Sequence, residues 1–391
     1  MGKRRVDWSA LPIELLRSIA EANQDSNDVV RFRSVCASWR SSIPSPRILP
    51  PFPLPLPSAG SARIAFVSRR TFYRFKLLDD VNPNPSTCSS KSWLVKVEEV
   101  EYGFKFLLNP LSNLHFRFPF PKGFNLLDYQ VVQVSKGYEL LSYSSGMPIV
   151  GVNKLVLFPD SVWNSSVKDT VIFALYNEGK LGYVKYFDRN WTLVDDLCHY
   201  DDIIVYKGKP YVVDEWGIVS WIDSSMKLID IYVSPPLESF GKQKHLVESR
   251  GELYVVDRFF DTERRFDHHL REYRVCPKTF TFDVYKLDQE CGRWVTVENL
   301  GDRVFFLGKD SSFSVSATEF SGCIGNCIYF TYEDDNGVFD QKTGEIVDFQ
   351  DWSHLFQLPP SWLNSNPHLN VEFRFQPDTV ADSCYLIIHV D

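Results

Sequence analysis

Few residues in this chain have the spacing that metal chemistry requires. Cys323 and Cys327 are the only close pair among the eight cysteines, and no histidine lies near them in the sequence. Because a structural zinc site takes four such ligands, we predict reduced thiols and no metal here. His268 and His269 are adjacent, so on a strand they would point to opposite faces. The acidic run 333–337 lacks the ligand spacing of a calcium loop and indicates a turn.

Catalytic motifs are equally scarce. The chain contains no nucleophile elbow, no phosphate-binding glycine loop and no His-Glu-x-x-His helix, so we predict no catalytic residue and no cofactor. The formal net charge of -8 gives no general attraction to nucleic acid. A secretory signal and a membrane-spanning run of about 18 apolar residues are both missing, which predicts a nuclear or cytoplasmic protein without membrane contact.

Arginine and aromatic residues gather in one segment between two β-type runs, from Arg258 to Arg274. Four rings, those of Phe259, Phe260, Phe266 and Tyr273, are interleaved with the arginines. Both residue types are favoured at protein interfaces, so we predict a substrate-binding insertion that suits an acidic or phosphorylated partner. The alternative is a solvated loop whose rings pack onto the domain. The candidate binding residues are Arg258, Arg264, Arg265, Arg271 and Arg274.

Two amphipathic helices are predicted before residue 44. Pro12 suits the first position of a helix, where its missing N–H is not needed. Apolar residues then recur at helical spacing, first at Leu11, Leu15, Leu16 and Ile19, and later at Val29, Phe32, Cys36, Trp39 and Ile43. So short a unit cannot bury a stable core alone. It must therefore pack on the rest of the chain or bind another protein.

The rest of the chain is predicted to be a spacer followed by a β domain. Seven prolines lie between Pro44 and Pro57, which predicts an extended linker over residues 44–60. From about Arg63 the apolar pattern alternates, and Gly, Asn and Asp break it into short runs. We predict strands in a mainly β domain over residues 61–391. The expected hairpin turns are Glu178-Gly179, Lys207-Gly208, Arg250-Gly251 and Asn336-Gly337.

An internal repeat narrows the architecture of this domain. Tyr211-Val212-Val213-Asp214 recurs as Tyr254-Val255-Val256-Asp257, and each copy follows a glycine turn. The 43-residue spacing is close to the length of a propeller blade. The segment 282–297 also resembles a kelch blade. We therefore predict a kelch-like β-propeller of about six or seven blades, with a pair of β-sandwiches as the alternative.

The N-terminal pattern resembles an F-box over residues 6–43. The resemblance lies in Leu11-Pro12, Leu15-Leu16 and Ile19, followed by Arg31-Phe32-Arg33-Ser34-Val35-Cys36 and Trp39-Arg40. Blocks such as 106–112 and 284–288 are similar to the C-terminal domain of plant F-box proteins of the SKIP and KIB types. Asn23 and Asn27 depart from usually apolar positions. The residues that match adaptor-binding positions are Leu11, Pro12, Leu15, Leu16, Ile19, Val35, Cys36 and Trp39.

What the resemblance implies is the substrate-recognition subunit of a Skp-cullin-F-box ubiquitin ligase. The F-box would dock on a Skp-type adaptor and, through it, on a cullin. The β domain would present an unidentified target protein for ubiquitination carried out by other subunits. Two alternatives stay open: a regulatory binding protein that acts outside the ligase, and a β-propeller enzyme or small-ligand binder.

Overall fold

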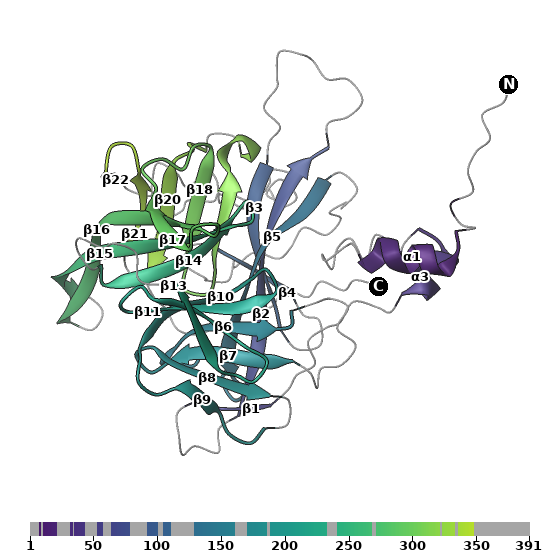
Figure 1. Ribbon diagram of the computed structural model, residues 1–391, viewed down its shortest axis with the longest axis horizontal. Coiled ribbons are helices and arrows are strands. Elements are labelled where there is room, and N and C mark those ends of the chain that lie inside the picture. Colours follow the sequence, from purple (N-terminus) through teal and green to yellow (C-terminus); the bar gives the residue numbers. More distant parts are fainter. Residues whose placement is uncertain are drawn as a thin grey trace, which may run out of the picture.

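The computed structural model describes the central part of the chain and short pieces of its N-terminal region. The described residues are 8, 11–21, 32–33, 35–43, 53–57, 64–78, 92–100, 105–110, 129–160, 170–185, 188–232, 241–267, 271–320, 323–332 and 335–347. Helices α1 (Ile13–Glu21) and α3 (Ala37–Ser42) lie to one side of the β-sheets (Figure 1). Neither these nor any other helix of the described residues is long and apolar enough to cross a bilayer.

Four antiparallel or mixed sheets make up the β domain in these ranges. The first has the order β4-β3-β2-β5-β6-β7-β8-β9, with β1 paired to β2. Its strands are β1 (Leu54–Pro55), β2 (Ile64–Leu77), β3 (Ser92–Glu99), β4 (Lys105–Leu108), β5 (Tyr129–Ser142), β6 (Val152–Phe158), β7 (Val171–Tyr176), β8 (Lys180–Lys185) and β9 (Thr192–Asp195).

The other three sheets follow one another along the chain. The second contains β10 (Tyr200–Tyr206), β11 (Lys209–Asp214), β12 (Val219–Ile222) and β13 (Leu228–Tyr232). The third contains β14 (Gln243–Ser249), β15 (Glu252–Asp267), β16 (Glu272–Asp288) and β17 (Arg293–Thr296). The last sheet has the order β19-β18-β20-β21-β22. Its strands are β18 (Arg303–Leu307), β19 (Ser312–Ser316), β20 (Cys327–Tyr332), β21 (Asp335–Asp340) and β22 (Glu345–Val347). The short helix η5 (Ala317–Glu319) follows β19.

Five strands from these sheets form a closed ring. Contacts run from β5 to β6, on to β10, β14 and β19, and back to β5. One cavity is lined by residues of all five strands. Strands β5 and β6 are joined by the single pair Tyr138–Leu155, so the nine-stranded sheet separates there into two units. The β domain is thus a propeller in which five units, or blades, surround a central channel.

The expectation of a mainly β propeller is confirmed, but that of six or seven blades is not. The ring closes with five blades in the described part of the chain. The prediction divided the domain length by a typical blade of about 45 residues. Here β2 and β5 have 14 residues each, β15 has 16 and β16 has 17, so single blades use more chain than expected.

The repeated Tyr-Val-Val-Asp motif occupies the same place in two neighbouring blades. One copy lies in β11 and the other in β15, each the second strand of its sheet. Both follow a two-residue turn with positive φ, at Lys207-Gly208 (45° and 72°) and Arg250-Gly251 (54° and 78°). Two positive φ values define the hairpin turn whose twist matches that of the flanking strands. The repeat is therefore structural, and these turn predictions are confirmed, as is that of Glu178-Gly179.

The predicted turn at Asn336-Gly337 is wrong. Both residues lie in β21, where they pair with Thr331 and Phe330 of β20. A Cβ atom on Gly337 would lie 2.9 Å from the Phe330 ring and 2.9 Å from Ile346. The glycine thus permits close packing of side chains within the blade and does not serve a turn.

Part of the predicted linker 44–60 belongs to the propeller. Leu54 and Pro55 form β1, which pairs with the start of β2. Leu54 is buried in the core of the first blades, and Trp191 donates its indole N–H to the carbonyl oxygen of Pro55 at 2.7 Å. Proline is tolerated there because β1 lies at the edge of its sheet.

Candidate docking surface and central channel

The N-terminal helices enclose a small core of their own. Helix α1 begins where the sequence predicts, since the Pro12 carbonyl accepts the N–H groups of Leu15 and Leu16 at 3.1 Å. Trp39 packs against Phe32 with their ring centroids 4.5 Å apart. Among the described residues of this helical unit, 11–43, the buried apolar side chains are Leu16, Ala20, Phe32 and Ile43. Part of its apolar pattern is thus used internally.

Other apolar side chains of the helical unit face solvent. Leu15 is 52% exposed and Ile19 42% exposed, and they stand one turn apart on α1. Val35 and Pro12 are exposed as well, whereas Leu11, Cys36 and Trp39 are half-buried. Leu16, predicted as a binding residue, is only 1% exposed and belongs to the core. The predicted set therefore divides into an exposed surface and the core beneath it. Asn23 and Asn27 lie outside the described residues.

The predicted arginine-rich insertion is a β-ribbon, not a loop. Strands β15 and β16 pair continuously from Tyr254–Lys286 to Asp267–Glu272, with one bulge at Phe259 and Phe260. The ribbon comprises the outer parts of these strands, 259–267 and 272–281, and extends beyond the neighbouring strands of the propeller (Figure 1).

Arg258, at the base of the ribbon, is not available to a substrate. It is 1% exposed. Its guanidinium donates to Asp335 at 2.6 Å, Thr279 at 2.7 Å and Gln243 at 2.8 Å. The rings of Phe260 and Tyr332 lie 4.8 and 4.6 Å from its guanidinium carbon. Arg258 thus joins the β14–β17 blade to β21 of the next blade, and its prediction as a binding residue is wrong.

The outer part of the ribbon is largely exposed to solvent. Arg264, Arg271 and Arg274 are exposed, while the side chain of Arg265 lies outside the described residues, as do His268 and His269. Phe266 and Tyr273 are exposed too, with ring centroids 5.2 Å apart. The ribbon also carries carboxylates, and Glu263 pairs with Lys278 at 3.4 Å. The outer ribbon therefore presents aromatic rings and both signs of charge.

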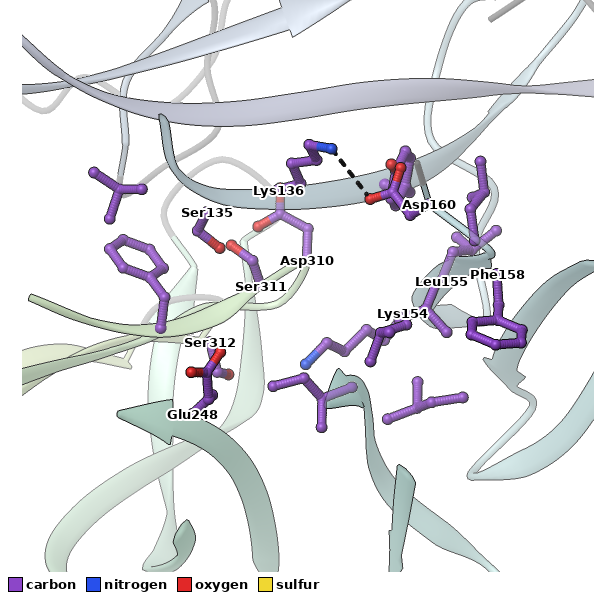
Figure 2. Close-up of a pocket in the computed structure, with 18 of the residues that line it drawn as sticks. Ser135, Lys136, Lys154, Leu155, Phe158, Asp160, Glu248, Asp310, Ser311 and Ser312 are labelled. Carbon is purple, nitrogen blue, oxygen red and sulfur yellow. Dashed lines mark hydrogen bonds and ion pairs between the residues drawn. The ribbon is translucent and has the colours of Figure 1, made fainter. Parts of the chain in front are cut away.

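The central channel brings together polar side chains that the sequence analysis did not single out. Its cavity has a volume of about 850 Å³. Ser135, Ser311 and Ser312 lie on one side of the space, and Leu155 and Phe158 lie on the other (Figure 2). The charged residues of the lining are Lys136, Lys154, Asp160, Glu248, Arg250, Arg303 and Asp310. Because they come from four of the five blades, no local motif could reveal them.

Buried ion pairs connect the inner strands around this channel. Lys154 of β6 contacts one oxygen of Asp202 of β10 at 2.5 Å, and the second oxygen accepts the N–H of Leu246 of β14 at 2.8 Å. Asp201 accepts the N–H of Lys244 at 2.9 Å. Burial raises the pKa of Asp201 to about 7. These links hold three consecutive inner strands in fixed positions.

A second buried network anchors the loop between β18 and β19. Asp310 contacts Lys96 at 2.7 Å and Arg70 at 3.6 Å, and Arg70 also pairs with Glu98 and Glu139. Burial alone would raise the pKa of Asp310, but the cations of Lys96 and Arg70 hold it below its ordinary value. The loop is thereby bound to strands β2, β3 and β5.

The close cysteine pair shows no arrangement for metal binding. In the part of the chain that the structure describes, no three metal-ligating side chains come together. Burial raises the pKa of the Cys323 thiol to about 11. Burial, assisted by the charge of Asp340, raises that of Cys327 to about 12. Both thiols are therefore protonated at neutral pH and are poor nucleophiles.

We expect these two thiols to resist alkylation. Since only the thiolate reacts, raised pKa values together with burial should make Cys323 and Cys327 at least about tenfold slower toward iodoacetamide at pH 7.5 than exposed Cys291. Peptide mass spectrometry of the native protein measures the three rates side by side. Equal rates at all three positions would contradict the described environment, and labelling in denaturant serves as the control.

Comparison with known proteins agrees with both parts of the molecule. The sequence pattern of the KIB1-4 β-propeller matches residues 63–347, which span the described blades. The chain belongs to the KIB1-4 β-propeller family. Among its Arabidopsis thaliana relatives, putative F-box protein At1g65770 is 33% identical, over 86% of this chain and 92% of its own length.

Two further relatives from the same plant match a larger share of this chain. F-box protein SKIP23 is 30% identical, over 92% of this chain and 96% of its own length. F-box protein At2g17036 is 32% identical, over 94% of this chain and 97% of its own length. This member of the KIB1-4 family is thus similar over most of its length to plant proteins named F-box proteins, the class that its N-terminal pattern resembles.

Proposed function

We propose that this chain is the substrate-recognition subunit of a Skp-cullin-F-box ubiquitin ligase. The observation that carries the proposal is that the helical unit has both an internal core of its own and an exposed apolar surface. Leu16, Ala20 and Phe32 are buried together, while Leu15, Ile19 and Val35 stay in solvent. An exposed apolar surface on so small a unit favours a protein partner. The F-box names of the relatives support a Skp-type adaptor as that partner.

In this proposal the propeller holds the target protein. Its outer ribbon offers exposed arginines and the aromatic pair Phe266 and Tyr273, the residue types that favour interfaces. Ubiquitin transfer is carried out by other subunits, so no catalytic residue is assigned to this chain. The candidate target-binding arginines that the structure leaves exposed are Arg264, Arg271 and Arg274.

The test is affinity purification of the full chain beside a Leu15→Asp, Ile19→Asp variant. Placing two carboxylates in the apolar surface should reduce adaptor recovery by at least about a hundredfold, since both would be buried unpaired in the interface. The matched control is Arg17→Asp, because Arg17 lies two positions from both Leu15 and Ile19 and hence on the opposite side of α1. Among the described residues, its Nε–H makes one long hydrogen bond there, at 3.4 Å, to the Ser42 carbonyl oxygen. We expect the control to recover the adaptor as the wild type does.

The readouts are immunoblots for the adaptor and cullin and mass spectrometry of other recovered proteins. Proteins recovered by both the wild type and the docking variant are candidate targets. Recovery of the adaptor by the docking variant at wild-type level, or its absence from the wild-type sample, would refute the ligase proposal. Trp39 is left unchanged in these variants because it packs on the core residue Phe32.

A further inference from the structure

Two seryl hydroxyls in the central channel are buried without a partner. Ser311 is 5% exposed and Ser312 is 7% exposed, and both line the channel cavity. Within the described residues, neither side-chain oxygen makes a hydrogen bond. Native proteins almost always satisfy buried polar groups, with protein, ordered water or ligand. These two hydroxyls therefore mark a place where a polar molecule is held.

The segment that carries these serines is rigidly placed. Asp310 precedes them and is fixed by Lys96 and Arg70. The N–H of Gly308 donates to the carbonyl oxygen of Ser311 at 3.0 Å and closes the loop. Strand β5 packs so tightly on the loop that a Cβ atom on Gly137 would lie 2.7 Å from the Asp310 carbonyl oxygen. The hydroxyls are thus pre-positioned, which is characteristic of a binding site.

A cation without a carboxylate partner lies on the same wall. Arg303 uses its Nε–H to donate to the hydroxyls of Ser314 at 2.8 Å and Ser249 at 3.2 Å. No carboxylate lies within ion-pair distance of Arg303 in the described part of the chain. Burial and the neighbouring charge of Arg250 lower the pKa of Arg303, and the more distant carboxylates of Asp302 and Glu319 offset this only in part. An anion beside Arg303 would relieve this repulsion.

The other charges of the lining leave room for an anion. Asp310 is neutralised by its two buried cations, and Asp160 lies 3.5 Å from Lys136. Glu248 opposes an anion, but one of its oxygens accepts the N–H of Gly251 at 3.2 Å and is directed toward the β14–β15 turn. Lys154 lies on the opposite wall (Figure 2), and its ammonium is neutralised by Asp202 at 2.5 Å.

We propose that the channel binds a small molecule that carries an oxyanion, with Arg303 pairing with the oxyanion and the Ser311 and Ser312 hydroxyls donating hydrogen bonds to the ligand. The cavity volume of about 850 Å³ is within the range of small-molecule sites, roughly 300–1,000 Å³. The ligand would occupy the axis of the propeller, away from the helical unit. The inference goes beyond the proposed ligase function and does not depend on it.

Calorimetric titration of the full-length chain with pyrophosphate tests the proposal, and a parallel titration with citrate separates phosphoryl from carboxylate ligands. We expect one molecule of at least one probe to bind per chain. A Ser311→Ala, Ser312→Ala variant should bind that probe at least about tenfold more weakly. Its melting temperature without probe should be unchanged or higher, because the variant removes two unsatisfied buried hydroxyls.

Two further variants complete the test. Arg303→Gln should also lose binding, and Arg303→Lys should recover part of it by restoring the charge. Arg271→Gln, which removes an exposed arginine from the ribbon turn, is the matched control and should bind as the wild type does. Absence of binding of both probes up to about 10 mM, or equal affinity of the serine variant and the wild type, would overturn the proposal. Adaptor recovery by the serine variant should be unchanged, so this failure is distinguishable from failure of the ligase proposal.

Discussion

Replacing Arg258 by alanine should destabilise the propeller by about 3–5 kcal/mol, the range expected when one partner of a buried ion pair is removed. The change leaves Asp335 buried without its cation and Thr279 without one of its partners. It also removes the guanidinium from between the rings of Phe260 and Tyr332. Since Arg258 and Asp335 belong to different blades, the loss should open the junction between them. Thermal and urea unfolding followed by tryptophan fluorescence measure the effect.

Arg271→Ala is the control for this prediction. Both variants lose one arginine from the same β-hairpin, but Arg271 is exposed at the ribbon turn. Its melting temperature should stay within about 1 °C of the wild type, as for most surface substitutions. Similar melting of the two variants would show that Arg258 does not hold the blades together. Tests of target binding should therefore substitute Arg264, Arg271 and Arg274 and leave Arg258 in place.

Arg258 also shows why the sequence could not separate binding residues from structural ones. Its partner Asp335 lies 77 positions away, so no local pattern distinguishes Arg258 from the exposed arginines beside it. The same holds for Lys96 and Asp310, which are 214 positions apart. An arginine next to aromatic rings fits a protein interface and a buried cation–π contact equally well.

Local signals, in contrast, predicted the elements of the fold. The change to short apolar runs from about Arg63 corresponds to the start of β2 at Ile64, and Lys207-Gly208 forms the predicted hairpin turn. Pro12 marks the start of α1. Such features depend on neighbours in sequence. The number of blades depends on where the ring closes, which is decided by contacts between inner strands far apart in the chain.

The docking surface and the channel site also differ in how far the sequence could predict them. The docking surface lies on one short helix, so periodicity could find Leu15 and Ile19, although it could not show that Leu16 is buried between the helices. The channel residues come from all five blades, which lie far apart in the sequence. Ser311 and Ser312 carry no signal in the sequence, because their significance depends on a cavity that exists only after the ring has closed.

Replacing Asp310 by alanine should have a second large effect, again about 3–5 kcal/mol. Lys96 would remain fully buried without its carboxylate, and Arg70 would lose one of its acidic partners. The stabilisation that Asp310 contributes also depends on pH. Lys96 and Arg70 hold the pKa of Asp310 below its ordinary value of 3.8 in the folded protein, so its contribution is present above about pH 4 and is lost as the pH falls further. The difference in melting temperature between wild type and variant should therefore narrow in acid.

A Lys96→Met, Asp310→Ala double variant separates the ion pair from the loop. Methionine resembles the lysine stem in volume and keeps contact with the Phe72 ring, over which the Lys96 ammonium lies at 4.7 Å. If the unpaired ammonium causes the loss, the double variant should be more stable than Asp310→Ala alone. Equal stability of the two variants would attribute the loss to displacement of the loop. Because that loop carries Ser311 and Ser312, its displacement would also weaken ligand binding in the channel. Calorimetric titration of both variants with the channel probes measures that loss of affinity.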